Sequence, residues 1–167
     1  FGVTMLSLGP ILGALNSEAG ILSPLLTVGI IIGTVFFGPI VDKFGYKWLL
    51  ITGSVFAVAG VLGLARFNDM TMLCTSIILL GFGGGILNGE TNALVSDIYD
   101  DKHRGVKLSI LGAFYCIGAL TWTLLCTFID YNYVLYGIAA VMVVFIIFFF
   151  CIEFPKAKPQ ENVSAKQ

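Results

Sequence analysis

The sequence predicts an all-α polytopic membrane protein, built as a bundle of six transmembrane helices. Hydrophobic residues make up 57% of the 167 residues and charged residues only 11%, with a mean hydropathy of +0.96. A soluble domain is about 45–50% apolar and about 25% charged. The apolar residues are gathered into long runs, most of them close to the roughly 20 residues that a helix needs to cross a bilayer. Short charged segments separate these runs, as expected of a multi-pass protein in contact with lipid.

The apolar runs give the expected spans in chain order. Residues 1–16 are interpreted as the end of a truncated first helix, with a kink at Gly9-Pro10. The other five spans are expected at Ile21–Val41, Trp48–Ala65, Met70–Ser96, Leu108–Ile129 and Tyr131–Ile152. The polar residues from Glu153 to Gln167 then form a tail.

The basic residues set the expected orientation. They are concentrated in three segments: Lys43 and Lys47; Lys102, Arg104 and Lys107; and Lys156, Lys158 and Lys166. With six spans these segments share one membrane face, and only Arg66 lies on the other. Loops rich in Lys and Arg stay in the cytoplasm, so the charged loops and the tail are expected there. The net charge of −1 and the lack of a basic, aromatic-rich patch exclude a nucleic-acid partner.

The turn between the second and third spans contains the most specific motif. Five of its residues match the pattern Gly-x-x-x-Asp-(Arg/Lys)-x-Gly-x-(Arg/Lys): Gly38, Asp42, Lys43, Gly45 and Lys47. This pattern resembles the signature of the major facilitator superfamily, although Tyr46 stands where that family usually has another Arg. The alternative is a solvated turn that merely follows the charge rule for cytoplasmic loops.

That resemblance implies a fold and a mechanism. It identifies residues 1–153 as the amino-terminal half of a twelve-helix carrier, made of a three-plus-three inverted repeat, and residues 154–167 as a linker toward a second half. In such carriers the two halves rock about a central site. The motif residues would then act as gating residues on the cytoplasmic side, together with Asp97 and Arg104, which could pair with each other or with Asp42.

The fourth span carries the candidate solute site. Its cluster Gly81–Gly85 lacks the Lys-Ser/Thr of a phosphate loop, and is expected to let another helix approach closely. Beyond it, Asn88, Thr91 and Asn92 share one helical face at about 100° per residue. Polar groups within a membrane usually face the bundle interior or a water-filled cavity. This face is therefore expected to bind a solute, or else to form interhelical hydrogen bonds.

Glu90 is the acid that lies deepest in a span. It lies about 200° around the helix from Asn88, so it does not share that face. It could take up and release a proton during transport, or pair with polar neighbours that line the inner half of the path.

The region from Asn88 to Gly105 resembles the sugar-transporting branch related to fucose–proton symporters. Asn92 would match the Asn of that branch, which places Asn88 where the branch has an acid. The resemblance implies a symporter for sugars or similar solutes, with Glu90 as the candidate for proton coupling.

The remaining residues narrow the function. The four cysteines, Cys74, Cys116, Cys126 and Cys151, have no paired spacing, and His103 sits in a charged segment. We therefore expect no metal, no cofactor and no enzymatic activity. Tyr115, Thr121 and Trp122 are candidate cavity residues, although packing is their simpler role.

The sequence thus favours a secondary transporter for a small polar solute, in a bacterial inner membrane. An efflux antiporter is the alternative within the superfamily, although the fifth span lacks the Gly-Pro signature of drug–proton antiporters. A receptor or accessory module that kept the fold without transporting is the alternative outside it.

Overall fold

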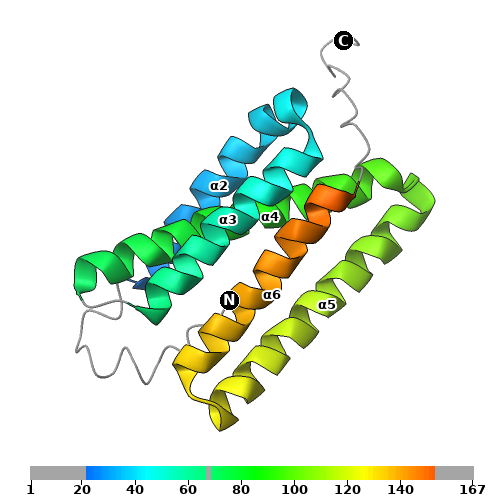
Figure 1. Ribbon diagram of the computed structural model, residues 1–167. Coiled ribbons are helices and arrows are strands. Elements are labelled where there is room, and N and C mark those ends of the chain that lie inside the picture. The colour runs from blue at the N-terminus through cyan, green and yellow to red at the C-terminus, as the bar shows by residue number, and fades with distance from the viewer. Residues whose placement is uncertain (1–21, 67–68, 153–167) are drawn as a thin grey trace.

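The computed structural model describes residues 22–66 and 69–152, and within them it is an all-α bundle (Figure 1). The described helices are α2 (Leu22–Phe44), α3 (Tyr46–Ala65), α4 (Met70–Ile98), α5 (Asp101–Phe128) and α6 (Tyr131–Cys151). Four of them, α3 to α6, are long and apolar enough to cross a membrane, and α2 contains a shorter apolar stretch at Pro24–Phe37. The predicted first span, residues 1–16, and the tail lie outside the described residues. The predicted fold class is confirmed for the five helices that follow the first span.

The expected turn at Asp42–Lys47 is wrong in its extent, because α2 continues through Phe44 and α3 begins at Tyr46. Only Gly45 separates the two helices. Its φ of 77° is left-handed, and its N–H donates to the Val41 carbonyl at 2.8 Å. A positive φ is strained for a residue with a side chain, so glycine is the residue suited to this junction. The motif glycine is therefore a helix terminator rather than one residue of a longer loop.

The fifth helix also begins earlier than predicted. It starts at Asp101 instead of Leu108, so the expected charged loop at Asp100–Gly105 is mostly the first turn of α5. The carbonyl of Asp100 accepts the N–H groups of His103 and Arg104, both at 2.9 Å. Charged residues mark where a chain leaves the hydrocarbon, but a helix can continue into water. At 28 residues, α5 is about 42 Å long and exceeds a hydrocarbon core of about 30 Å.

Helix α4 is the centre of the bundle, and its glycine cluster explains why. A side chain at Gly81 would lie 2.5 Å from the Leu26 carbonyl of α2, and one at Gly85 would collide with the Ile30 carbonyl. Gly83 faces the other way, where a side chain would lie 2.5 Å from the backbone N of Ala57 in α3. The predicted close approach is confirmed, and it occurs on two sides of α4 at once.

Helices α3 and α4 run antiparallel along what we call the α3–α4 seam. A Cβ added at Gly53 would meet the side chain of Ile86, and one at Gly60 would lie 2.6 Å from the backbone N of Leu80. Gly63 closes this seam at its far end against Ser76. Small residues allow membrane helices to approach at backbone distance, so the seam positions any side chain within it tightly.

Helix α6 is attached to α3 at both ends. Near one end, Arg66 Nε donates to the Tyr136 hydroxyl at 3.1 Å, with the guanidinium 5.9 Å from the ring centre. At the other end, Lys47 Nζ donates to the Phe150 carbonyl at 2.9 Å. The indole of Trp48 also packs edge-on against the Phe150 ring, with centroids 6.4 Å apart. These contacts hold α6 alongside α3.

Helix α5 lies at the edge of the bundle beside α6 (Figure 1). None of its described side chains is fully buried, unlike those of its neighbours. Side chains added at Gly112 and Gly118 would meet nothing within 4 Å. The described part of the chain therefore leaves one long flank of α5 without a packing partner.

Candidate functional site

Asn88 and Asn92 form an exposed polar pair on α4. The Asn92 amide Nδ2 donates to the Asn88 backbone carbonyl at 2.8 Å and to its side-chain oxygen at 3.2 Å. Their predicted neighbouring positions on one face are confirmed. An amide group offers two donors and one acceptor, and the Asn92 NH2 group makes both hydrogen bonds within the pair. The Asn88 amide NH2 and the Asn92 amide oxygen make no other hydrogen bond within the described residues, so they are open to a solute.

Thr91 is a weaker candidate than the polar pair. Its hydroxyl donates to the Leu87 carbonyl of its own helix at 2.8 Å. A hydroxyl has one proton to donate, so Thr91 can offer a solute only its acceptor lone pairs while that bond persists. The helical angle of 100° per residue places Thr91 on the polar face. It does not show that the hydroxyl is bonded to the Leu87 carbonyl.

Glu90 points away from the polar pair and into the α3–α4 seam. It is fully buried, its carboxyl group approaches the backbone of Leu50, and neither oxygen makes a hydrogen bond of regular geometry with the described atoms. An uncompensated buried polar group costs about 1–3 kcal/mol, and a charged one costs more. Native structures rarely keep such a group without a reason, which makes Glu90 the most unusual ionisable residue in the described structure.

Asp97 lies on the same seam, about two helical turns from Glu90. Its Oδ2 accepts a hydrogen bond from the Tyr46 hydroxyl at 2.6 Å, and Tyr46 is only 3% exposed. The sequence predicts that Asp97 pairs with Arg104 or Asp42. The structure gives it a hydrogen bond with Tyr46, which the sequence did not predict. In the sequence, Tyr46 stands out only as a departure from the motif. Its position at the start of a helix and its hydroxyl are the signals that could have suggested the contact.

We expect Tyr46→Phe to lower the stability of the protein by about 1.5–3 kcal/mol, because it removes a hydrogen bond to an ionised group and keeps the ring. Thermal unfolding in detergent measures the change. Tyr133→Phe is the matched control, because Tyr133 is 71% exposed. Equal melting temperatures for the two variants would contradict a stabilising Tyr46–Asp97 contact.

The other predicted gating residues are only partly placed. Gly38, Asp42 and Lys43 belong to the last turns of α2, and the side chains of Asp42 and Lys43 lie outside the described ones. Arg104 is exposed in the first turn of α5. Lys47 donates to the Phe150 carbonyl, where a cation stabilises the carboxyl end of α6. This contact joins residues 103 positions apart, and no local pattern could have indicated it.

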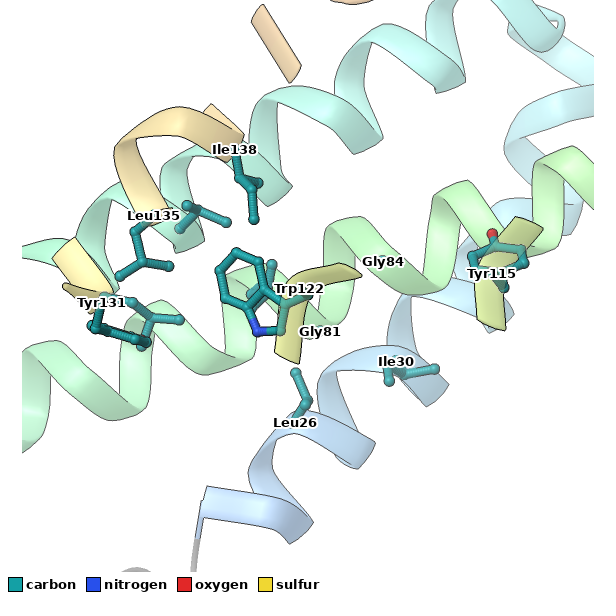
Figure 2. Close-up of a pocket in the computed structure, with 12 residues that line it drawn as sticks. Leu26, Ile30, Gly81, Gly84, Tyr115, Trp122, Tyr131, Leu135 and Ile138 are labelled. Atoms are coloured by element: carbon teal, nitrogen blue, oxygen red, sulfur yellow. The ribbon is translucent and has the colours of Figure 1, made fainter. Parts of the chain in front are cut away.

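An apolar groove separates α5 from the rest of the bundle (Figure 2). Its volume is about 380 Å³, and Trp122 projects from α5 into its centre. The lining residues come from all five described helices: Leu26, Ile30, Val61, Leu64, Leu80, Gly81, Gly84, Tyr115, Trp122, Tyr131, Leu135 and Ile138. Tyr115 and Trp122 thus line a groove, and Trp122 also packs against the buried core, which is the simpler role named for it in the sequence. Thr121 instead is exposed and donates to the Ile117 carbonyl of its own helix.

Within residues 22–66 and 69–152, no three His, Cys, Asp or Glu side chains lie close enough together to hold a metal ion. All four cysteines are free thiols.

The sequence profile of the Major Facilitator Superfamily matches residues 1–167, the whole of the chain. The chain belongs to this superfamily. Proteins of this family are transporters rather than enzymes, and a multi-pass membrane protein fits the apolar helices. The motif from Gly38 to Lys47 is thus explained by family membership.

Individual relatives of this major facilitator chain match over part of its length. It is 29% identical over 109 residues to the Cercosporin MFS transporter CTB4 of Cercospora nicotianae, which covers 64% of the chain and 21% of that protein. It is 32% identical over 91 residues to Multidrug resistance protein MdtH of Citrobacter koseri, covering 54% of the chain and 23% of the relative. The MdtH protein of Klebsiella pneumoniae is 33% identical over 91 residues, with the same coverage. The matched region thus spans less than a quarter of each of these relatives.

Proposed function

We propose that residues 1–153 form the amino-terminal half of an alternating-access secondary transporter, that residues 154–167 lead toward its second half, and that the solute is small and polar. The exposed polar pair Asn88–Asn92 on an otherwise apolar helix supports this proposal. Amide groups bind hydroxyl groups both as donors and as acceptors. A hydroxyl-rich solute such as a sugar suits this surface.

The geometry of α4 separates the solute surface from the helix-packing surface. The glycines at positions 81, 83 and 85 pack against α2 and α3, whereas the polar pair is exposed. Two amides exposed to acyl chains would be costly. Their exposure in the described half is reasonable if they face a watery path shared with a second half.

Proton coupling is assigned to Glu90 within this proposal. The residue lies outside the solute surface, so a proton taken up there would act through the packing of α3 against α4 rather than by direct contact with the solute. A carboxyl group with no partner in one conformation can gain one when the helices move, which makes its proton affinity depend on the conformation.

We expect Asn88→Ala and Asn92→Ala to lower kcat/KM for solute uptake about tenfold each, since each removes about one hydrogen bond to the solute. Uptake by the full-length protein in proteoliposomes, screened over neutral sugars, measures the effect. Thr75→Ala is the control, because Thr75 is another exposed polar residue of α4. Its hydroxyl donates to a carbonyl of its own helix. Uptake unchanged in both Asn variants would remove the polar pair from the solute site.

Export of an organic compound is the second candidate, and the names of the relatives favour it. The two functions differ in the direction of flux under an imposed pH gradient. Inward accumulation of a sugar supports the first function, and proton-driven export of an apolar compound supports the second. Binding without any flux would instead indicate a receptor or accessory protein.

A further inference from the structure

A second apolar groove, which we call the α5–α6 groove, lies between the last turns of α5 and the first half of α6. The two helices lie beside each other there (Figure 1). The groove has a volume of about 470 Å³ and shares Ile138 with the groove of Figure 2. Its lining extends along α6 from Tyr133 to Met142, with Leu125 and Ile129 on the side of α5. Gly137 leaves it open, because a side chain there would meet nothing within 4 Å.

The length of the α5–α6 groove matches one leaflet of a bilayer. The lining residues from Tyr133 to Met142 extend about 14 Å along α6, at about 1.5 Å per residue. The hydrocarbon core is about 30 Å thick, so one leaflet supplies about 15 Å of it. Tyr133 is exposed beside the helix junction, and tyrosine is enriched at the membrane–water interface. A lipid acyl chain therefore fits the groove in length, whereas a membrane-spanning helix would need a groove about twice as long.

A cation lies at the interface end of the groove. Arg66 Nε donates to the hydroxyl of Tyr136, which is one helical turn from Tyr133. A guanidinium group has five N–H donors, and that of Arg66 makes no other hydrogen bond with the described residues. Its remaining N–H groups are therefore available to an acceptor at the membrane surface, and phosphate is the acceptor that Arg binds most strongly there.

An anion lies at the same end. Asp130 is the residue before α6, is exposed, and makes no side-chain capping bond. It precedes Tyr136 by about 9 Å along the helix axis. Among the described residues Asp69 is the other acid at this end, and its carboxylate already accepts the Met72 N–H at 2.8 Å. One positive and one negative side chain thus remain open, which suits a headgroup that carries both charges.

We propose that the α5–α6 groove binds a phospholipid whose headgroup contains a phosphate and a primary ammonium group, as in phosphatidylethanolamine. One acyl chain lies against Gly137, the phosphate accepts hydrogen bonds from Arg66, and the ammonium donates to Asp130. A quaternary ammonium has no proton to donate, so a choline headgroup satisfies Asp130 less well. The bound lipid would join α3 and α6 to α5, whose described side chains are not fully buried.

Lipid titration of the purified full-length protein in detergent tests this proposal. Native mass spectrometry measures the number of bound lipids and their affinity. Phosphatidylethanolamine should bind with a stoichiometry of about one and raise the melting temperature. Phosphatidylcholine and phosphatidylglycerol should each bind about tenfold more weakly, because each lacks the ammonium donor for Asp130. Diacylglycerol, which has neither charge, should bind more weakly still.

Two variants separate the headgroup contact from the chain contact. Arg66→Gln should weaken the binding of phosphatidylethanolamine about tenfold, since a charge-assisted hydrogen bond is lost. Gly137→Phe should prevent binding by filling the groove, while the Arg66–Tyr136 contact stays in place. Lys102→Gln is the matched control, because it removes an exposed positive charge at the opposite end of α5. Its affinity for the lipid should be unchanged.

Three results would overturn the proposal: equal affinity for phosphatidylethanolamine and diacylglycerol, equal weakening by Arg66→Gln and Lys102→Gln, or unchanged binding in Gly137→Phe. If Arg66→Gln does not fold, Asp130→Asn takes its place. That variant should abolish the preference for phosphatidylethanolamine over phosphatidylcholine, and a preference that persists would contradict the assignment of Asp130. These measurements do not involve transport, so failure of the proposed function would leave them intact.

Discussion

Replacing Glu90 is expected to make the protein more stable and its transport worse. The carboxyl group is fully buried, and neither oxygen has a partner among the residues that the structure describes, so Glu90→Met should raise the free energy of unfolding by about 1–3 kcal/mol. Methionine has a similar length and adapts to irregular packing. Thermal unfolding of the purified protein in detergent measures the gain.

The effect on transport is tested with Glu90→Gln, which keeps the shape and removes the ionisable group. Accumulation driven by a pH gradient should be abolished, whereas exchange of solute across equilibrated vesicles should persist. Normal accumulation would remove Glu90 from proton coupling.

Asp97 supplies the matched control for the stability measurement, because it is an acid on the same seam that already has a partner in Tyr46. Asp97→Asn should lower the free energy of unfolding rather than raise it. If Glu90→Met and Asp97→Asn both destabilise the protein to the same extent, Glu90 has a stabilising partner that the described structure lacks.

Adding a single methyl group at Gly83 is expected to disrupt the centre of the bundle. The new Cβ would lie 2.5 Å from the Ala57 backbone N and 2.6 Å from the Gly53 carbonyl oxygen. Neither atom belongs to a flexible side chain, so α3 and α4 must separate. We expect Gly83→Ala to cost about 3 kcal/mol, at the upper end of the usual range for overpacking. The fall in melting temperature and in the yield of monodisperse protein measures this cost.

Gly137→Ala is the comparison for that substitution, because a side chain at Gly137 on α6 meets nothing within 4 Å. Alanine is a better helix former than glycine by about 1 kcal/mol. The Gly137 variant should therefore be as stable as the original or slightly more so. If the Gly83→Ala and Gly137→Ala proteins have the same melting temperature, the α3–α4 seam is looser than described.

Hydropathy predicted the existence of the described helices but not their ends. The predicted span Leu108–Ile129 begins where the chain enters hydrocarbon, whereas α5 begins at Asp101, because water tolerates a charged helix. The hydrophobic signal reports the solvent around a residue and not its backbone conformation. For α6 the two coincide within one residue, since it is apolar almost from end to end.

The candidate site was predictable where it depends on a single helix. The positions of Asn88, Asn92 and Glu90 around α4 follow from 100° per residue, and the structure confirms that Glu90 lies on another face. Contacts between helices were not predictable in the same way. The Tyr46–Asp97 and Lys47–Phe150 hydrogen bonds join residues 51 and 103 positions apart, so they depend on how the helices pack.

The link between α2 and α3 leaves almost no slack, since Gly45 alone joins helices of 23 and 20 residues. Because a single residue joins them, a displacement of the end of α2 also moves the start of α3. Lys47 then transmits it to the end of α6.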